Sequence, residues 1–146
     1  MAIAATYTAI LDLARATSGI AFAPEELPIS LSEADLPCCL LRVGEAEWNE
    51  HAVGLHRQVR HYYLDCFVAP IGEGVVPDEG YKKCLTPMHN LGHTFLSYPT
   101  LSGAVDMIGG GRGAPAFRDG GVIGLEYAGR KHFGFTLDLL VTEKGT

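Results

Sequence analysis

Apolar residues recur at two different spacings along the chain, and each spacing predicts a different kind of element. Over residues 6–18 they fall at i, i+3, i+4 and i+7, which is typical of a helix with one buried stripe. The stripe consists of Tyr7, Ile10, Leu11 and Ala14. Gly19 follows at the position where a left-handed residue commonly ends a helix. The pattern predicts a helix that covers a sheet.

Two strands joined by a long loop are expected next. Residues 36–43 form an apolar run, and residues 58–68 are rich in aromatic and β-branched side chains. Alternation divides the second run into two partly apolar faces. One face carries Tyr62, Leu64, Cys66 and Val68, and the other carries Val59, His61, Tyr63, Asp65 and Phe67. Residues 44–54 are too many for a tight hairpin turn, so we expect a protruding loop there.

The second half of the chain predicts one more helix and three strands. Thr86 and Pro87 fit the N-cap and first position of a helix that runs to about Ser97. Its buried stripe is Met88, Leu91 and Phe95. Strands are expected over residues 101–108, 122–128 and 133–141, the last with strict alternation. Six of the 13 residues in 109–121 are glycine, which predicts a flexible loop.

This order of elements predicts an α+β fold. We expect a mixed, mainly antiparallel sheet with two helices packed on one face and long hairpin loops. Residues 20–36 and 70–78 contain prolines and no sustained period, so they are connectors. A chain of 146 residues with 47% apolar content fits one domain over 1–146.

Charge and composition narrow the classes of function. The net charge of -6 argues against a surface that grips nucleic acid, because such surfaces are usually basic. The N-terminal residues lack the basic region of an export signal, and no apolar run is long enough to span a membrane. Adjacent Cys38 and Cys39 in an apolar run, with Cys66 and Cys84, are expected to be reduced, buried thiols. We expect a protein made in a reducing cytoplasm.

Three patterns could carry chemistry, and each has a simpler explanation. Cys84, His89 and His93 have the spacing of metal ligands, but a second closely spaced cysteine pair is missing. The glycines of 109–113 lack the lysine and Ser/Thr of a phosphate-binding loop. A Cys/His nucleophile pair has nothing to activate it, and burial of Cys66 would raise its pKa. We therefore expect no enzyme, no metal site and no cofactor.

Four short segments together resemble the tail terminator proteins of siphophages, of the minor tail protein U type. They are Glu33-Ala34-Asp35 with Pro37, the strand end Phe67-Val68-Ala69-Pro70, the turn Tyr98-Pro99-Thr100-Leu101, and the last strand Phe133 to Val141. The resemblance spans nearly the whole chain, and the chain departs from it in the Gly109 to Gly121 loop and in its cysteine and histidine content. Glu33, Asp35 and Pro37 are interpreted as residues that set the first strand in register.

The resemblance implies a structural protein of the phage virion. Such a protein forms a hexameric ring at the head-proximal end of the tail, stops polymerisation of the tail tube protein, and offers a docking surface to the head connector. The ring would assemble in the host cytoplasm, and DNA would pass through its lumen without specific binding. Two alternatives stay open: a head completion or head-to-tail joining protein of the same neck, and a small metal- or cysteine-dependent enzyme.

A ring needs interface and lumen residues, and the sequence offers candidates for both. We expect a subunit interface at Trp48, His51, Leu55, Tyr63 and Phe67, since aromatic residues are favoured at interfaces. Trp48 could equally fold back as a lid on its own core. Acidic residues of the same predicted loop, Glu45, Glu47 and Glu50, are the candidates for the lumen.

Overall fold

A six-stranded antiparallel sheet organises the molecule. The computed structural model describes residues 2–52, 55–72, 77–109 and 115–145. Three long strands lie side by side in the order β1 (Cys38–Ala52), β2 (Leu55–Pro70) and β6 (Arg130–Gly145). Three short strands pair in succession with the other edge of β6. They are β3 (Met107–Ile108), β4 (Phe117–Asp119) and β5 (Ile123–Tyr127).

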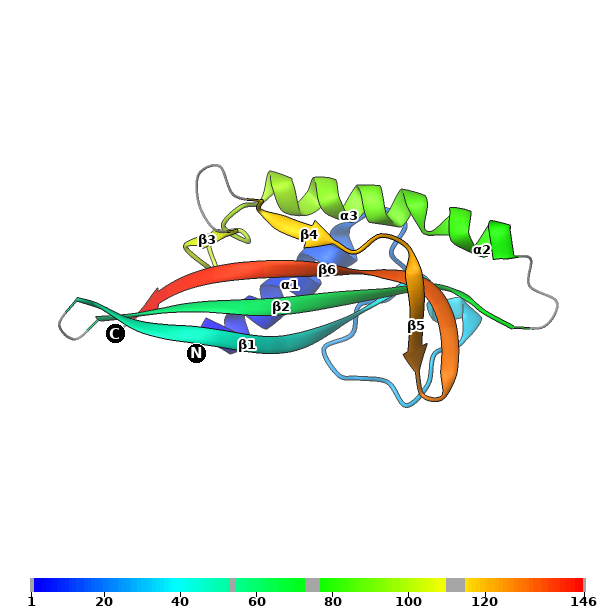
Figure 1. Cartoon of the computed structure of the whole chain (residues 1–146), viewed down its shortest axis with the longest axis horizontal. Coiled ribbons are helices and arrows are strands. Elements are labelled where there is room, and N and C mark those ends of the chain that lie inside the picture. The colour runs from blue at the N-terminus through cyan, green and yellow to red at the C-terminus, as the bar shows by residue number, and fades with distance from the viewer. Residues whose placement is uncertain (1, 53–54, 73–76, 110–114, 146) are drawn as a thin grey trace.

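Helices cover one face of this sheet. They are α1 (Ala2–Ala16), α2 (Pro77–Lys83) and α3 (Leu85–Ser97), and the 3-10 turn η1 (Glu33–Asp35) lies in the connector before β1. In Figure 1, α1 passes behind the long strands, and α2 and α3 lie along their upper edge. β5 lies toward the right of this view. The predicted α+β architecture is confirmed.

The core lies between the helices and the predicted apolar face of the strands. Ile10, Leu11 and Ala14 of α1 and Leu91 and Phe95 of α3 are all 0% exposed. They pack on one face of β2 and β6, whose inward side chains are Tyr62, Leu64, Cys66, Phe135, Leu137, Leu139 and Val141. Alternation in the sequence identified this face correctly, because a strand sends successive side chains to opposite sides.

A second, smaller cluster covers one end of the other face. Leu31, Cys38, Leu40 and Phe67 are buried there against Leu36, Leu125 and Tyr127. The ring of Phe67 meets Tyr127 edge-on at 5.7 Å and His132 at 5.5 Å between ring centroids. The remainder of this face has no helix over it in the described part of the chain, and we call it the open face.

The expected loop over residues 44–54 is wrong, since β1 continues through them to Ala52. The pairing with β2 shifts register between Val43 and Ala46 and then resumes. A bulge of this kind absorbs extra residues without ending the ladder. A Cβ on Gly44 would lie 2.5 Å from the Tyr63 ring and 3.0 Å from the His61 carbonyl oxygen, so any other residue there would have to displace the ring.

The expected strand over 101–108 is also wrong except for its last two residues. Leu101, Ser102 and Gly103 have φ values of 50°, 58° and 90°, which are incompatible with a strand. Leu101 is nevertheless 1% exposed, so its apolar character reflects burial in a turn. The glycine-rich stretch 109–121 contains β4, and residues 110–114 lie outside the described residues.

The second helix begins earlier than expected. Residue Cys84, rather than Thr86, occupies the N-cap of α3, and Pro87 falls within its first turn. Proline is tolerated there because the first backbone N–H groups of a helix have no partner within it. The buried stripe is as predicted, with Leu91 and Phe95 fully buried and Met88 packed against the core.

Candidate functional site

The long strands continue past α3 as a three-stranded ribbon, which we call the extension, and α1 covers part of it. It comprises residues 46–52 of β1, 55–60 of β2 and 141–145 of β6. Figure 1 shows it reaching beyond α3 at the left of the molecule. Each strand continues a core strand, and the pairing of β2 with β6 runs without a register shift from His56 to Phe67, whereas the pairing of β1 with β2 shifts register between Val43 and Ala46.

Trp48 is the main apolar side chain of the extension. It is 56% exposed and lies on the face of the sheet that carries the helices further along. Its ring centroid lies 5.5 Å from that of His56, and the Arg60 guanidinium carbon lies 6.0 Å from it. Arg60 donates hydrogen bonds to the Gln58 side chain at 2.8 Å and to the Gly44 carbonyl at 2.9 Å. An exposed indole is therefore held beside a fixed positive charge.

A buried carboxylate ties the base of the extension to α1. Glu143 is 5% exposed and accepts hydrogen bonds from the Thr6 hydroxyl and from Gln58 Nε2, the latter at 3.4 Å. Burial, together with this negative charge, raises the pKa of Tyr62 to about 12. These contacts satisfy a buried charged group, as the interior of a protein requires.

Polar pairs cross the open face of the sheet. Arg42 binds Asp65 through two nitrogens at 2.6 and 3.1 Å, and the Thr136 hydroxyl donates to the same carboxylate at 2.7 Å. The pKa of Arg42 is raised chiefly by this hydrogen bond. His61 Nδ1 lies 2.8 Å from Asp138 Oδ1. The Arg42 and His61 pairs flank Tyr63, which stacks on His61 with 5.8 Å between ring centroids.

Two shallow hollows lie on either side of His61 on the open face. One, of about 310 Å³, is bounded by Phe117, Arg118 and Asp138, and the other, of about 350 Å³, by Glu45, Glu47 and Val59. His61 and Leu140 line both. Apart from the His61 and Asp138 pair, these walls bring no titratable groups within hydrogen-bond distance of one another in the described residues.

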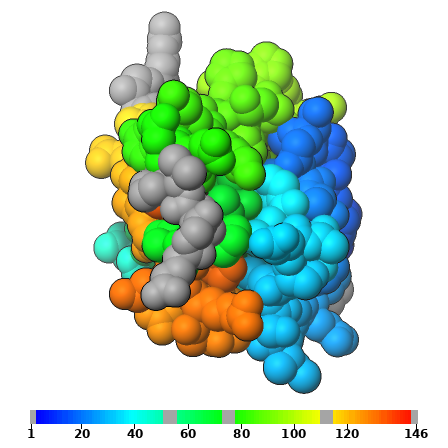
Figure 2. All heavy atoms as spheres, turned by 90° about the vertical axis from the view of Figure 1, so that its right-hand side faces the viewer, coloured from blue at the N-terminus to red at the C-terminus, as the bar shows by residue number. Residues whose placement is uncertain are grey.

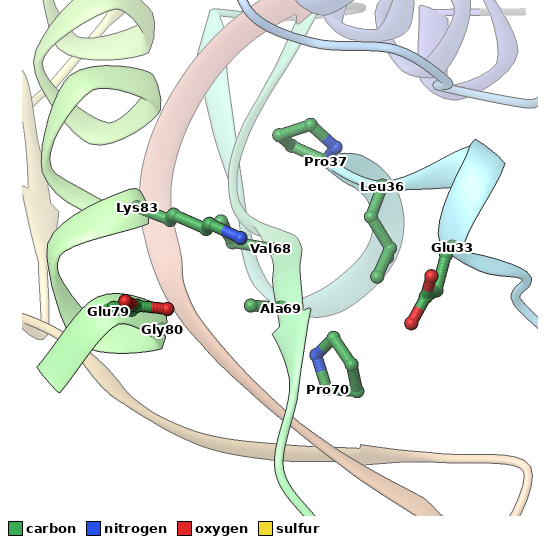
Figure 3. Close-up of a pocket in the computed structure, with 9 residues that line it drawn as sticks. All are labelled: Glu33, Leu36, Pro37, Val68, Ala69, Pro70, Glu79, Gly80 and Lys83. Carbon is green, nitrogen blue, oxygen red and sulfur yellow. The ribbon is translucent and has the colours of Figure 1, made fainter. Parts of the chain in front are cut away.

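A larger hollow of about 470 Å³, which we call the end hollow, lies at the opposite end of the molecule from the extension. Figure 2 looks at this end, where α2 and the connector meet. Five residues of the connector and of β2 give the hollow an apolar lining: Leu36, Pro37, Val68, Ala69 and Pro70. In Figure 3, Glu79, Gly80 and Lys83 of α2 stand on one side and Glu33 on the other.

The structure separates the predicted interface residues. Trp48 is exposed on the extension, whereas Tyr63 is half-buried on the open face, where its hydroxyl donates to Glu45 at 3.0 Å. Phe67 is 3% exposed beneath the chain's own second cluster, so it has almost no surface to offer a neighbour. The backbones of His51 and Leu55 belong to β1 and β2, and their side chains lie outside the described ones.

The predicted lumen carboxylates are all exposed, and they do not share one face. Glu45 and Glu47 lie on the open face, and Glu50 lies on the same face as Trp48, opposite His56. Hydrogen bonds from its own backbone amide and from Tyr63 lower the pKa of Glu45. Their assignment to a lumen stays a prediction.

The three residues before β1 have distinct roles. The Asp35 carboxylate accepts a hydrogen bond from the Ser32 backbone at 2.9 Å and closes the η1 turn. The Pro37 carbonyl accepts from the Ala21 amide at 2.9 Å, which fastens the connector to the start of β1. Glu33 is exposed and lines the end hollow.

The cysteines and histidines considered as metal ligands or nucleophiles differ in exposure. Cys84 is fully buried, and burial raises its pKa to about 11, whereas His89 and His93 are exposed on α3. A hydrogen bond with Cys39 and burial raise the pKa of Cys66, in the direction expected. Within the described residues, no three histidine, cysteine or acidic side chains are grouped as metal ligands would be.

Sequence reasoning missed Arg60 and the end hollow. Arg60 could have been found from its position on the same strand face as Tyr62, where a charged residue interrupts the apolar alternation. The end hollow is lined by three separate stretches of the chain, so no local sequence pattern predicts it.

Comparison with known proteins gives no relative from which a role could be transferred. No protein-family model matches the chain, and no curated protein sequence matches it. Among the described helices, none has both the length and the hydropathy needed to cross a bilayer.

Proposed function

We propose that this chain is a structural subunit of a phage neck that assembles into a tail-terminating ring. The observation that carries the proposal is the extension, an antiparallel projection with a largely exposed tryptophan beside a hydrogen-bonded arginine. Tryptophan and arginine are the residue types most enriched among the energetically dominant positions of protein interfaces. The four short segments that resemble tail terminator proteins are a second source of support for the proposal.

The ring would work by occupying surfaces rather than by catalysis. A closed ring of identical subunits needs two different contact surfaces on each copy. One flat side would cover the last ring of tail tube subunits and stop further addition, and the other would receive the head connector. The net charge of -6 suits a lumen through which DNA slides without being held.

Electron microscopy of the purified protein, alone and mixed with tail tubes, tests the proposal. Hexameric rings that cap one end of each tube are the expected result. Rings that bind only capsid portals would instead indicate a head completion protein. Particles that remain single subunits at every concentration, and that leave tubes uncapped, would contradict a ring-forming role altogether.

Replacing Trp48 with alanine should weaken assembly about tenfold or more, because an exposed aromatic anchor is lost. Leu96→Ala is the matched control, since Leu96 is 62% exposed on α3 and lies away from the extension. Light scattering of both variants across a concentration series gives the measurement. An unchanged mass for Trp48→Ala would remove Trp48 from the interface.

A further inference from the structure

Two surface features of unassigned role lie at opposite ends of the molecule. The extension carries the exposed Trp48, and the end hollow lies where β2 ends between α2 and the connector. In Figure 1 the extension reaches the left end of the long axis, and α2 and the end of β2 lie near the right. Two different surfaces at opposite ends are the arrangement that head-to-tail contact between copies requires.

We propose that the extension of one copy docks in the end hollow of the next, with Trp48 as the inserted side chain. The proposal rests on the proposed function, and it names the two surfaces through which the ring would close. The occupant of the end hollow is therefore a second copy of this chain.

The apolar part of the two surfaces matches in size and character. The end hollow has about 470 Å³, within the range of sites that enclose small organic groups. Leu36, Pro37 and Pro70 line it and offer flat aliphatic surface to an indole. Burying the exposed part of Trp48 there would remove apolar surface from water on both partners.

The charged part of the two surfaces is complementary in both signs. Arg60 and His56 lie beside Trp48, and the rim of the end hollow carries Glu33 and Glu79. Glu50 lies on the same face as Trp48, and Lys83 stands on the rim. In the described part of the chain, none of Glu33, Glu79 and Lys83 forms an ion pair within its own subunit. These rim charges are thus available to a neighbour.

The extension is prepared for docking before it meets a partner. Arg60 is held by two hydrogen bonds, so little of its side-chain freedom is left to lose on association. The base of the extension is fixed to α1 through Thr6 and Glu143. A fixed projection loses less entropy on binding than a mobile loop does.

A charge swap between two exposed residues tests the contact directly. Glu50→Lys and Lys83→Glu should each weaken assembly by up to about fivefold, and the double variant should recover most of the loss. Both residues are exposed, so neither change should disturb folding. Sedimentation measures the assembly constant for all four proteins. If the double variant loses as much assembly strength as the two single variants together, the pairing of Glu50 with Lys83 is overturned.

Cross-linking between copies provides a second measurement. A mixture of Glu50→Cys and Lys83→Cys variants, oxidised by an added organic disulfide, should form a mixed dimer that neither variant forms alone. The four native thiols are fully buried, and oxidised wild-type protein is the control. Rings without the mixed dimer would overturn this docking and leave the proposed function intact. Absence of rings from wild-type protein would overturn the proposed function itself.

Discussion

Gly134 shows how single positions decide whether the central strands can pair. It lies in β6 opposite Phe67, where a Cβ would come within 2.1 Å of the Cys66 carbonyl oxygen. That atom belongs to the backbone of the neighbouring strand, so it cannot move aside as a flexible side chain could.

We expect Gly134→Ala to lower the free energy of unfolding by about 1–3 kcal/mol, because the added methyl group forces β2 and β6 apart. Urea denaturation followed by circular dichroism measures the change. Gly72→Ala is the control, since a Cβ at Gly72 meets no atom within 4 Å. Equal stability of the two variants would show that the strands tolerate the extra volume.

His132 makes the stability depend on pH. It is 3% exposed, its ring Nδ1 has no hydrogen-bond partner among the described residues, and burial lowers its pKa below the ordinary 6.5. As the pH falls through 6.5, the unfolded chain takes up this proton before the folded chain does, so the native state loses stability. Above that pH the histidine is neutral in both states and contributes no pH dependence.

Unfolding of wild-type protein and of His132→Gln should be compared between pH 7.5 and pH 5. We expect acidification to destabilise the wild type more than the variant, because the glutamine has no proton to gain. The difference between the two curves isolates His132 from the other histidines. Parallel curves would indicate that the folded protein accommodates the charged ring.

At the scale of whole elements, β6 holds the fold together. It pairs with β2 along nearly its whole length and with β3, β4 and β5 on its other edge. Its inward side chains belong to the core cluster that also contains residues of α1 and α3. A substitution near the middle of β6 therefore disturbs both the pairing of the sheet and the packing of the helices on it.

Leu137→Ala should reduce the free energy of unfolding by about 2–5 kcal/mol, since Leu137 is 0% exposed and the cavity has little room to collapse. Leu96→Ala, at an exposed leucine of α3, should change it by less than about 0.5 kcal/mol. Thermal and urea unfolding of both variants give the comparison. Similar losses for the two would mean that β6 is not the centre of the core.

The sequence predicted elements well where periodicity and burial coincide. In β2, alternation separated the buried Tyr62 and Leu64 from the other face, and in β6 it identified Leu137. It failed over 46–52, because polar residues occupy both faces of a strand that projects into solvent. It failed at Leu101 for the opposite reason, since a turn can be buried as deeply as a strand.

The site was predicted only in part. Trp48 is exposed and does not fold back as a lid, whereas Phe67 is covered by residues from distant parts of the chain, among them Leu31 and Tyr127. The end hollow combines the connector, the end of β2 and α2. Such long-range proximity follows from tertiary packing, which local patterns do not encode.

At the scale of the whole molecule, assembly should change apparent stability. A partner that binds only the folded state stabilises it by mass action, so an assembling protein melts at a temperature that rises with its concentration. Calorimetry over a hundredfold concentration range should show this rise for wild-type protein and a flatter response for Trp48→Ala. A midpoint independent of concentration in the wild type would indicate a monomer.

The bulge at Gly44 also affects the direction in which the long strands leave the body of the molecule. The ladder between β1 and β2 shifts register between Val43 and Ala46, at the boundary between the body and the extension. A bulge bends its strand and increases the local twist, so this joint fixes the angle at which the extension leaves the body. In a closed assembly, that angle sets the curvature from one copy to the next. In the proposed ring, we therefore expect variants at Gly44 to change the number of copies.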